Sequence, residues 1–168
     1  MSAPARTIAS FRQWLRVTRE RAVLSDLALL GARIGLAWIF IYHGAGTLFG
    51  AFSGPGVHVM AVYFGRVAHL HPATFFAVSS GIIEFFGGIA VGCGLLGRLA
   101  AAGLVADMVI AMVTVTFRNG LESSSAGSGY ELNVALAALA LVVALLGTGR
   151  FSLDRLAPVG SAHHRSQS

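Results

Sequence analysis

Three ionisable side chains lie inside long apolar runs of this sequence, and their types and positions could support chemistry. They are Arg33 in LLGARIGLAW, Glu84 in GIIEFFGG and Asp107 in GLVADMVIA. Charged groups at membrane depth are rare and usually face a protein interior, so each marks a candidate site. With a helical rise of about 1.5 Å per residue, Arg33 and Asp107 lie at similar depths and Glu84 lies near the midplane. We therefore predict a buried polar network of these three residues, in which Arg33 pairs with one carboxylate.

The charge balance of this network suggests what it could do. One cation and two carboxylates leave an excess negative charge unless one carboxyl holds a proton. A low-dielectric interior favours the neutral form of a carboxyl, and a carboxyl that exchanges its proton near neutral pH could carry protons. The alternative is a structural role, in which the charges hold helices in register. No catalytic set and no metal site is expected, because the single Cys93 and the spacing His69-x-His71 do not supply a ligand set.

A second polar cluster is expected toward the other end of the apolar runs. His43 lies near the end of the first run, Glu131 opens the fourth, and Arg118 lies in the preceding loop. Geometry allows a hydrogen bond between His43 and Glu131. His43 is also placed to bind haem iron, but no obvious second intramembrane histidine accompanies it, so haem is disfavoured.

The elements that must position these residues are membrane spans. Of the 168 residues, 55% are hydrophobic and 11% are charged, whereas soluble domains carry about 25% charged residues. Four apolar runs are long enough for a hydrocarbon core of about 30 Å. They cover about residues 25–49, 72–96, 99–117 and 130–146, within a membrane domain of residues 25–149. We predict an all-α transmembrane four-helix bundle, with no room for a soluble catalytic domain.

The flanking segments predict an orientation. Residues 1–24 carry five Arg beside apolar residues at near-helical spacing, which is typical of a basic amphipathic helix at the membrane interface. Three more Arg lie in the polar tail, residues 150–168, and Arg98 lies in a short turn, whereas the other side has only Arg66 and Arg118. Because nine Arg residues lie on the side of the termini and only two on the other side, we expect both termini in the cytoplasm. Because the Arg residues flank membrane spans, nucleic acid is not an expected partner.

Small residues at helical spacing predict close helix contacts. Gly31-xxx-Gly35 and Gly88-xxx-Gly92 form two such seams. Four short helices bury little surface alone, so a homodimer through these seams is one expected partner arrangement.

Four segments together resemble the DoxX family over roughly Leu29 to Asp154. The matching segments are His43–Gly50 (HGAGTLFG), Glu84–Gly88 with Gly94–Arg98, Gly129–Glu131, and Gly147–Asp154. The family usually has Lys after the His-Gly-x-x segment, and this chain has Thr47. Any role of that cation is therefore lost here or carried elsewhere.

The resemblance implies a small multi-pass protein of the bacterial cytoplasmic membrane that associates with redox enzymes. Members of the family are subunits of quinone-linked sulfur oxidation systems or membrane anchors for soluble oxidative-stress and sulfurtransferase enzymes. We therefore predict an anchor, structural or quinone-site subunit of such a complex, not catalytic alone, with lipids and other redox proteins as partners. The alternative is a small-solute or proton carrier that uses the buried carboxylates. A quinone- or haem-binding enzyme in its own right ranks third.

Overall fold

A computed structural model of the chain describes residues 4–122 and 128–156, with the backbone alone for residues 4–19 and 21. Its described part is helical and contains no strand. The α-helices are α1 (Pro4–Phe49), α2 (Gly56–Arg66), α3 (Ala73–Cys93), α4 (Gly97–Ala111), α5 (Glu131–Leu146) and α6 (Leu153–Leu156). Three short turns complete the described elements: 3-10 turns η1 (Ala51–Ser53) and η3 (Phe117–Asn119), and a π-helical turn η2 (Met112–Thr116).

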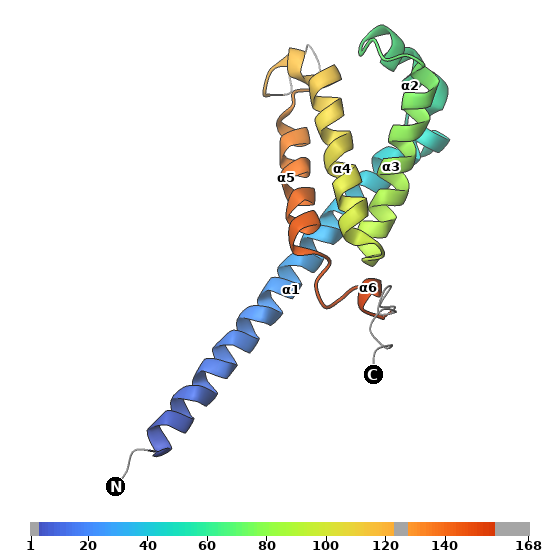
Figure 1. The fold of residues 1–168 in the computed structure, drawn as a ribbon. Coiled ribbons are helices and arrows are strands. Elements are labelled where there is room, and N and C mark those ends of the chain that lie inside the picture. Colours follow the sequence, from blue (N-terminus) through green and yellow to red (C-terminus); the bar gives the residue numbers. More distant parts are fainter. Residues whose placement is uncertain (1–3, 123–127, 157–168) are drawn as a thin grey trace, which may run out of the picture.

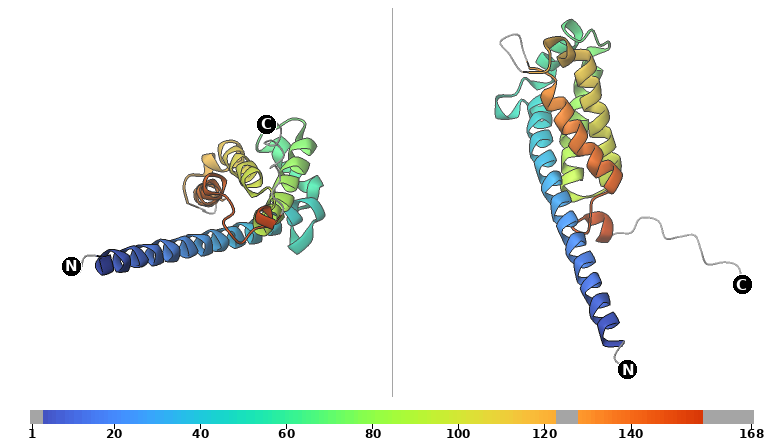
Figure 2. Two further views of the ribbon diagram at one scale, coloured as in Figure 1. Left: turned by 60° about the horizontal axis from the view of Figure 1, so that its bottom comes forward. Right: turned by 90° about the vertical axis from the view of Figure 1, so that its left-hand side faces the viewer.

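The long helices pack side by side in a helical bundle, and α2 lies against α3 and α1. The main contacts join α1 to α3, α3 to α4, α4 to α5, and α5 back to α1, while α2 packs on α3 and α1 (Figures 1 and 2). We call the end with the α3–α4 turn and α6 the turn end, and the opposite end the α2 end.

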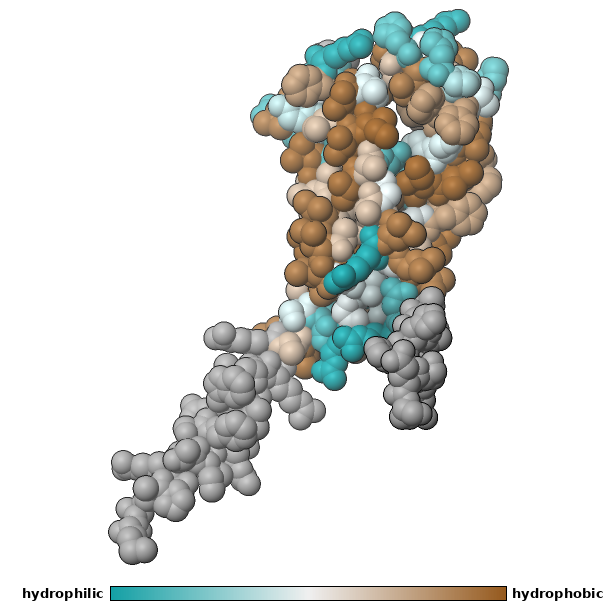
Figure 3. All heavy atoms as spheres, in the orientation of Figure 1, coloured by the Kyte–Doolittle hydropathy of each residue, from teal (hydrophilic) through white to brown (hydrophobic). Residues whose placement is uncertain are grey.

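Three helical stretches in the described part are long and apolar enough to cross a membrane: Ala22–Phe49, Ala73–Cys93 and Gly97–Asn119. The shorter apolar helix α5 has 16 residues, about 24 Å at the usual helical rise. On the face seen in Figure 3, a hydrophobic belt lies between more polar ends. The prediction of an all-helical protein with membrane-spanning helices is therefore confirmed, with three span-capable helices rather than four.

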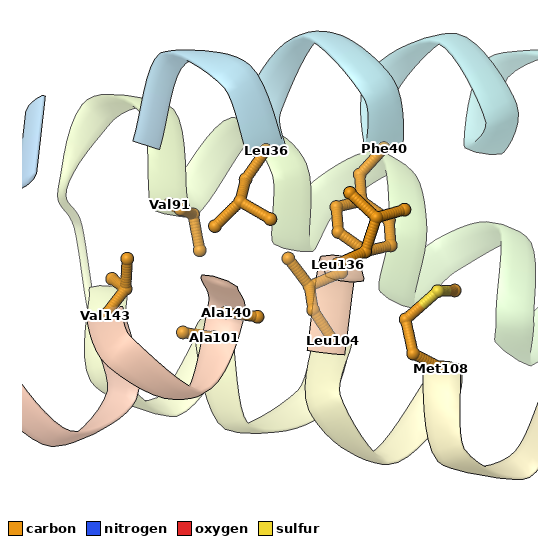
Figure 4. Packing of buried hydrophobic residues seen from close by; sticks show 9 residues of the cluster. All are labelled: Leu36, Phe40, Val91, Ala101, Leu104, Met108, Leu136, Ala140 and Val143. Atoms are coloured by element: carbon orange, nitrogen blue, oxygen red, sulfur yellow. The ribbon is translucent and has the colours of Figure 1, made fainter. Parts of the chain in front are cut away.

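The bundle core is made of apolar side chains from α1, α3, α4 and α5 (Figure 4). Its buried members are Leu36, Phe40, Val91, Ala101, Leu104, Met108, Leu136, Ala140 and Val143. Glycine permits the closest approach of α1 and α3, because a Cβ on Gly44 would overlap the backbone of Phe85. A Cβ on Gly88 would lie 3.1 Å from Phe40 Cβ. The other seam differs: a Cβ on Gly31 or Gly35 would meet no described atom within 4 Å.

The N-terminal segment is part of α1 rather than a separate helix. Residues 4–24 continue into the apolar stretch without a break, and α1 projects beyond the turn end (Figure 1). Between Pro4 and Gly31 the sequence has no Gly or Pro to interrupt the helix, and Ala, Leu, Arg and Glu are favourable helix formers. The expectation of a distinct interfacial amphipathic helix in residues 1–24 is therefore not confirmed.

Candidate functional site

A cavity of about 310 Å³ lies between the bundle helices and α2. Each of the five helices α1 to α5 contributes residues to its wall. The lining residues are Ile39, Phe40, His43, Thr47, Met60, Tyr63, Phe64, Ser80, Glu84, Asp107, Met108, Ala111, Val115, Thr116, Ser128, Leu132, Asn133 and Leu136. Most are apolar or aromatic, with polar groups interspersed, and none is Arg or Lys. A mostly apolar pocket with a few polar groups is typical of small-molecule sites.

The two predicted carboxylates meet in this cavity. Glu84 from α3 and Asp107 from α4 both line it, and they are close enough for their charges to interact. Asp107 is only 8% exposed and is hydrogen-bonded by the side chain of Ser80. Its Oδ2 atom is buried and has no hydrogen-bond partner. A buried acceptor without a partner costs free energy, so this atom marks a place where a ligand group would be stabilised.

Other polar groups on the same wall bond to one another. Thr116 Oγ1 donates to Asn133 Oδ1 at 3.2 Å, and Asn133 Nδ2 approaches Met108 Sδ at 3.7 Å. Thr116 ends the π-helical turn η2, and such turns inside α-helices occur frequently at functional sites. These pairings join η2 and α4 to α5, and they leave the Asp107 oxygen unpaired.

Arg33 lies outside this cavity, in a separate layer nearer the turn end. The buried guanidinium donates from Nε to Val91 O at 2.8 Å and from Nη2 to Gly92 O at 2.7 Å. Its Nη1 donates to Thr148 O and Phe151 O, both at 2.7 Å. The last carbonyls of a helix lack intrahelical partners, and Arg33 supplies them for α3.

The predicted pairing of Arg33 with a buried carboxylate is therefore not formed in the structure. Val91 follows Glu84 by seven residues on α3, about 10 Å along the helix. Arg33 is at the level of Val91 and uses its donors on backbone carbonyls. The network separates into a carboxylate pair in the cavity and an arginine at the turn end.

A second charged residue at the turn end is Asp154, which sequence reasoning did not single out as a site residue. Asp154 accepts hydrogen bonds from Leu96 N at 2.7 Å and Gly97 N at 3.2 Å, so its carboxylate caps the start of α4. Asp154 N also donates to Gly94 O at 2.9 Å. Asp154 and Arg33, with the segments 94–97 and 147–154, form what we call the clasp.

The clasp needs glycine where its segments meet. Gly94 has φ +69°, and a Cβ there would lie 2.5 Å from both Arg33 Nη2 and Ser152 Cβ. A Cβ on Gly97 would overlap the side chain of Thr148. The two Gly-containing segments identified in the sequence, Gly94–Arg98 and Gly147–Asp154, are thus packed against each other. Their short length and glycine content were the only sequence signals of this contact.

Of the predicted second cluster, only His43 lines the cavity. His43 lines the cavity together with the carboxylates, and its ring makes an edge contact with Tyr42 at 5.5 Å between centroids. Glu131 lies in the first turn of α5 and Arg118 in η3, and neither lines the cavity. Within the described residues, no group of three or more His, Cys, Asp or Glu side chains is arranged to hold a metal ion.

Comparison with known proteins gives one match. The DoxX family model matches residues 28–117, which is more than half of the chain. The matched stretch runs from the apolar part of α1 to η3 and includes Arg33, Glu84 and Asp107. Comparisons with curated proteins and with solved structures found no match.

Proposed function

Since the chain belongs to the DoxX family, we propose that this membrane protein is the integral membrane subunit of a quinone-linked or oxidative-stress redox complex. The single observation that supports this role best is the cavity with the Glu84–Asp107 pair. It is large enough for a small aromatic ring, and its wall combines apolar and aromatic side chains with a few polar groups. A quinone head group needs this combination. The chain would then provide the quinone site, and a partner would provide the redox centre.

The route to the cavity suits a ligand that dissolves in lipid. The α2 wall, which includes Met60, Tyr63 and Phe64, belongs to a helix that packs on α3 and α1. Val115 and Leu132 line the opposite, α4–α5 side. In Figure 3 hydrophilic residues interrupt the hydrophobic belt between α4 and α3. A quinone could therefore enter sideways from the bilayer instead of from water.

The turn end is the proposed docking side for a soluble partner. In the orientation indicated by the Arg distribution, this end faces the cytoplasm of a bacterial inner membrane and α5 acts as the fourth span. α1 projects from the turn end as a continuous helix (Figure 1). The open face at Gly31 and Gly35 is available for a second copy of the chain or another membrane helix.

Purification from native membranes tests this proposal. A tagged chain would be extracted with its surrounding lipid in a polymer nanodisc, and co-purifying proteins and quinones would be identified by mass spectrometry. We expect a redox protein in a fixed ratio to the chain and a quinone enriched over bulk lipid. A chain that is always isolated alone, with quinone at the bulk-lipid ratio, would contradict the proposal.

A second candidate is a proton or small-solute carrier, which the neighbouring Glu84 and Asp107 favour because the cavity lining includes no Arg or Lys. Uptake into proteoliposomes tests it with Glu84→Gln and Asp107→Asn. Glu131→Gln is the matched control, because this carboxylate does not line the cavity. Loss of flux in the first two variants but not in the control supports a carrier. Unchanged flux in both cavity variants excludes it.

A further inference from the structure

The two carboxyl groups in the wall of the cavity, Glu84 and Asp107, offer hydrogen-bond acceptors to a ligand. An ionised carboxylate accepts hydrogen bonds and donates none. Asp107 is 8% exposed, and its Oδ2 has no partner. Glu84 lies close enough to interact with it electrostatically. If the two carboxyls share one proton, several carboxyl oxygens still remain as acceptors.

Three donors on the same wall as Asp107 are already engaged. The Ser80 side chain bonds to Asp107 itself. Thr116 donates to Asn133, and the Asn133 amide approaches Met108 Sδ. The cavity lining includes no Arg or Lys that could neutralise the carboxylates. The ligand group that bonds directly to the ionised Asp107 Oδ2 must therefore be a hydrogen-bond donor.

The two redox forms of a quinone differ in this property. A hydroquinone carries two hydroxyl groups that can donate, whereas a quinone carries two carbonyl oxygens that only accept. A carbonyl placed against Asp107 would leave the buried oxygen unsatisfied and would bring two negatively polarised oxygens together. A hydroxyl in the same position would form a charge-assisted hydrogen bond, which is roughly twice as strong as a neutral one.

We propose that the cavity beside Asp107 and Glu84 binds the reduced, hydroxyl-bearing form of a quinone more tightly than the oxidised form. This inference rests on the proposed quinone role and adds which redox form of the quinone the cavity prefers. The expected preference is about tenfold or more, because hydrogen bonds to charged groups contribute about that factor. Preferential binding of the reduced form raises the midpoint potential of the bound two-electron couple by about 30 mV for each tenfold.

Binding measurements on the purified full chain in lipid nanodiscs test the proposal. The probes are a benzoquinone with a ten-carbon tail and its hydroquinone, titrated under anaerobic conditions by calorimetry. Asp107→Asn replaces one acceptor oxygen by a donor group, and Glu131→Gln removes a carboxylate that does not line the cavity. We expect the wild type and Glu131→Gln to bind the hydroquinone at least tenfold more tightly, and Asp107→Asn to bring the two affinities within about threefold.

Each outcome is decisive. Equal affinity of the wild type for both forms, or tighter binding of the oxidised form, overturns the inference while leaving the quinone role intact. Failure of both forms to bind overturns the quinone role and the inference with it. A preference that is unchanged in Asp107→Asn refutes the assignment to this carboxylate. If Asp107→Asn does not fold, the midpoint potential of the quinone bound to the wild type decides, because only preferential binding of the reduced form raises it.

Discussion

Replacing Arg33 by Met removes the most heavily bonded side chain at the turn end. The guanidinium makes four hydrogen bonds of 2.7–2.8 Å, to the carbonyls of Val91, Gly92, Thr148 and Phe151. Met fills a similar volume but donates no hydrogen bond. The substitution therefore removes the side-chain donor of all four carbonyls, of which Val91 O keeps a backbone donor, Gly94 N. It also removes four bonds that join α1 to α3 and to the segment after α5.

The expected loss of stability follows from the number of bonds. Interhelical hydrogen bonds in membrane proteins contribute about 0.6 kcal/mol on average and about 1.7 kcal/mol at most. Four of them amount to roughly 2–7 kcal/mol. Removing a buried charge also removes its desolvation cost, which offsets part of this loss. We expect Arg33→Met to lower the free energy of unfolding by about 3 kcal/mol.

Unfolding by a denaturing detergent in mixed micelles measures this loss, with Arg98→Met as the matched control. Arg98 is exposed and makes one hydrogen bond, to Leu145 O at 3.2 Å, so its replacement should cost less than about 1 kcal/mol. Arg33→Lys should be intermediate, because an ammonium group lacks the planar fork of a guanidinium. Equal losses for Arg33→Met and Arg98→Met would refute the role assigned to Arg33.

Three further substitutions test other contacts. Asp154→Ala should cost about 1–2 kcal/mol of unfolding free energy in the same assay, because α4 loses its cap, and a neutral result would contradict the clasp. Gly44→Ala should lower the thermal unfolding midpoint, because the added Cβ overlaps the backbone of Phe85; an unchanged midpoint would show that the two helices can separate at no cost. Thr47→Lys should weaken hydroquinone binding about tenfold, because Thr47 lines the cavity and a cation there would pair with Glu84. In calorimetry Thr47→Val should stay within about threefold of the wild type, and the same weakening in Thr47→Val would show that charge is not the cause.

The partners of Arg33 could not be predicted from the sequence. Hydropathy placed this residue in a span, and a carboxylate was the natural partner to expect. The actual acceptors are backbone carbonyls, which every residue carries, so no residue type marks them. Two of them belong to the segment after α5, and their position depends on how that segment folds back onto α3.

The sequence could have predicted that His43 lines the same cavity as Phe40 and Thr47. Phe40, His43 and Thr47 recur at spacings of three and four residues, so they share one face of α1, and all three line the cavity. Depth alone grouped Glu131 with His43, and Glu131 does not line the cavity that His43 lines. Depth places residues along the bundle axis, whereas the rotation of each helix decides which residues meet.

The length of α5 shows another limit of hydropathy. The apolar pattern of residues 130–146 predicts a helix there, and the structure has α5 at Glu131–Leu146. Its 16 residues lie below the length usual for a span. Packing against α4 and α1 holds α5 in the bundle. The hydropathy of one segment does not reveal such contacts with other helices.

Quinone retention from native membranes tests the central claim most directly. The wild type, Asp107→Asn and Glu131→Gln would each be extracted in polymer nanodiscs, and the quinone bound per chain would be measured against the quinone-to-lipid ratio of the whole membrane. The account predicts enrichment in the wild type and in Glu131→Gln, and loss of the reduced form in Asp107→Asn. Equal quinone content in all three samples, at the bulk-membrane ratio, would contradict it.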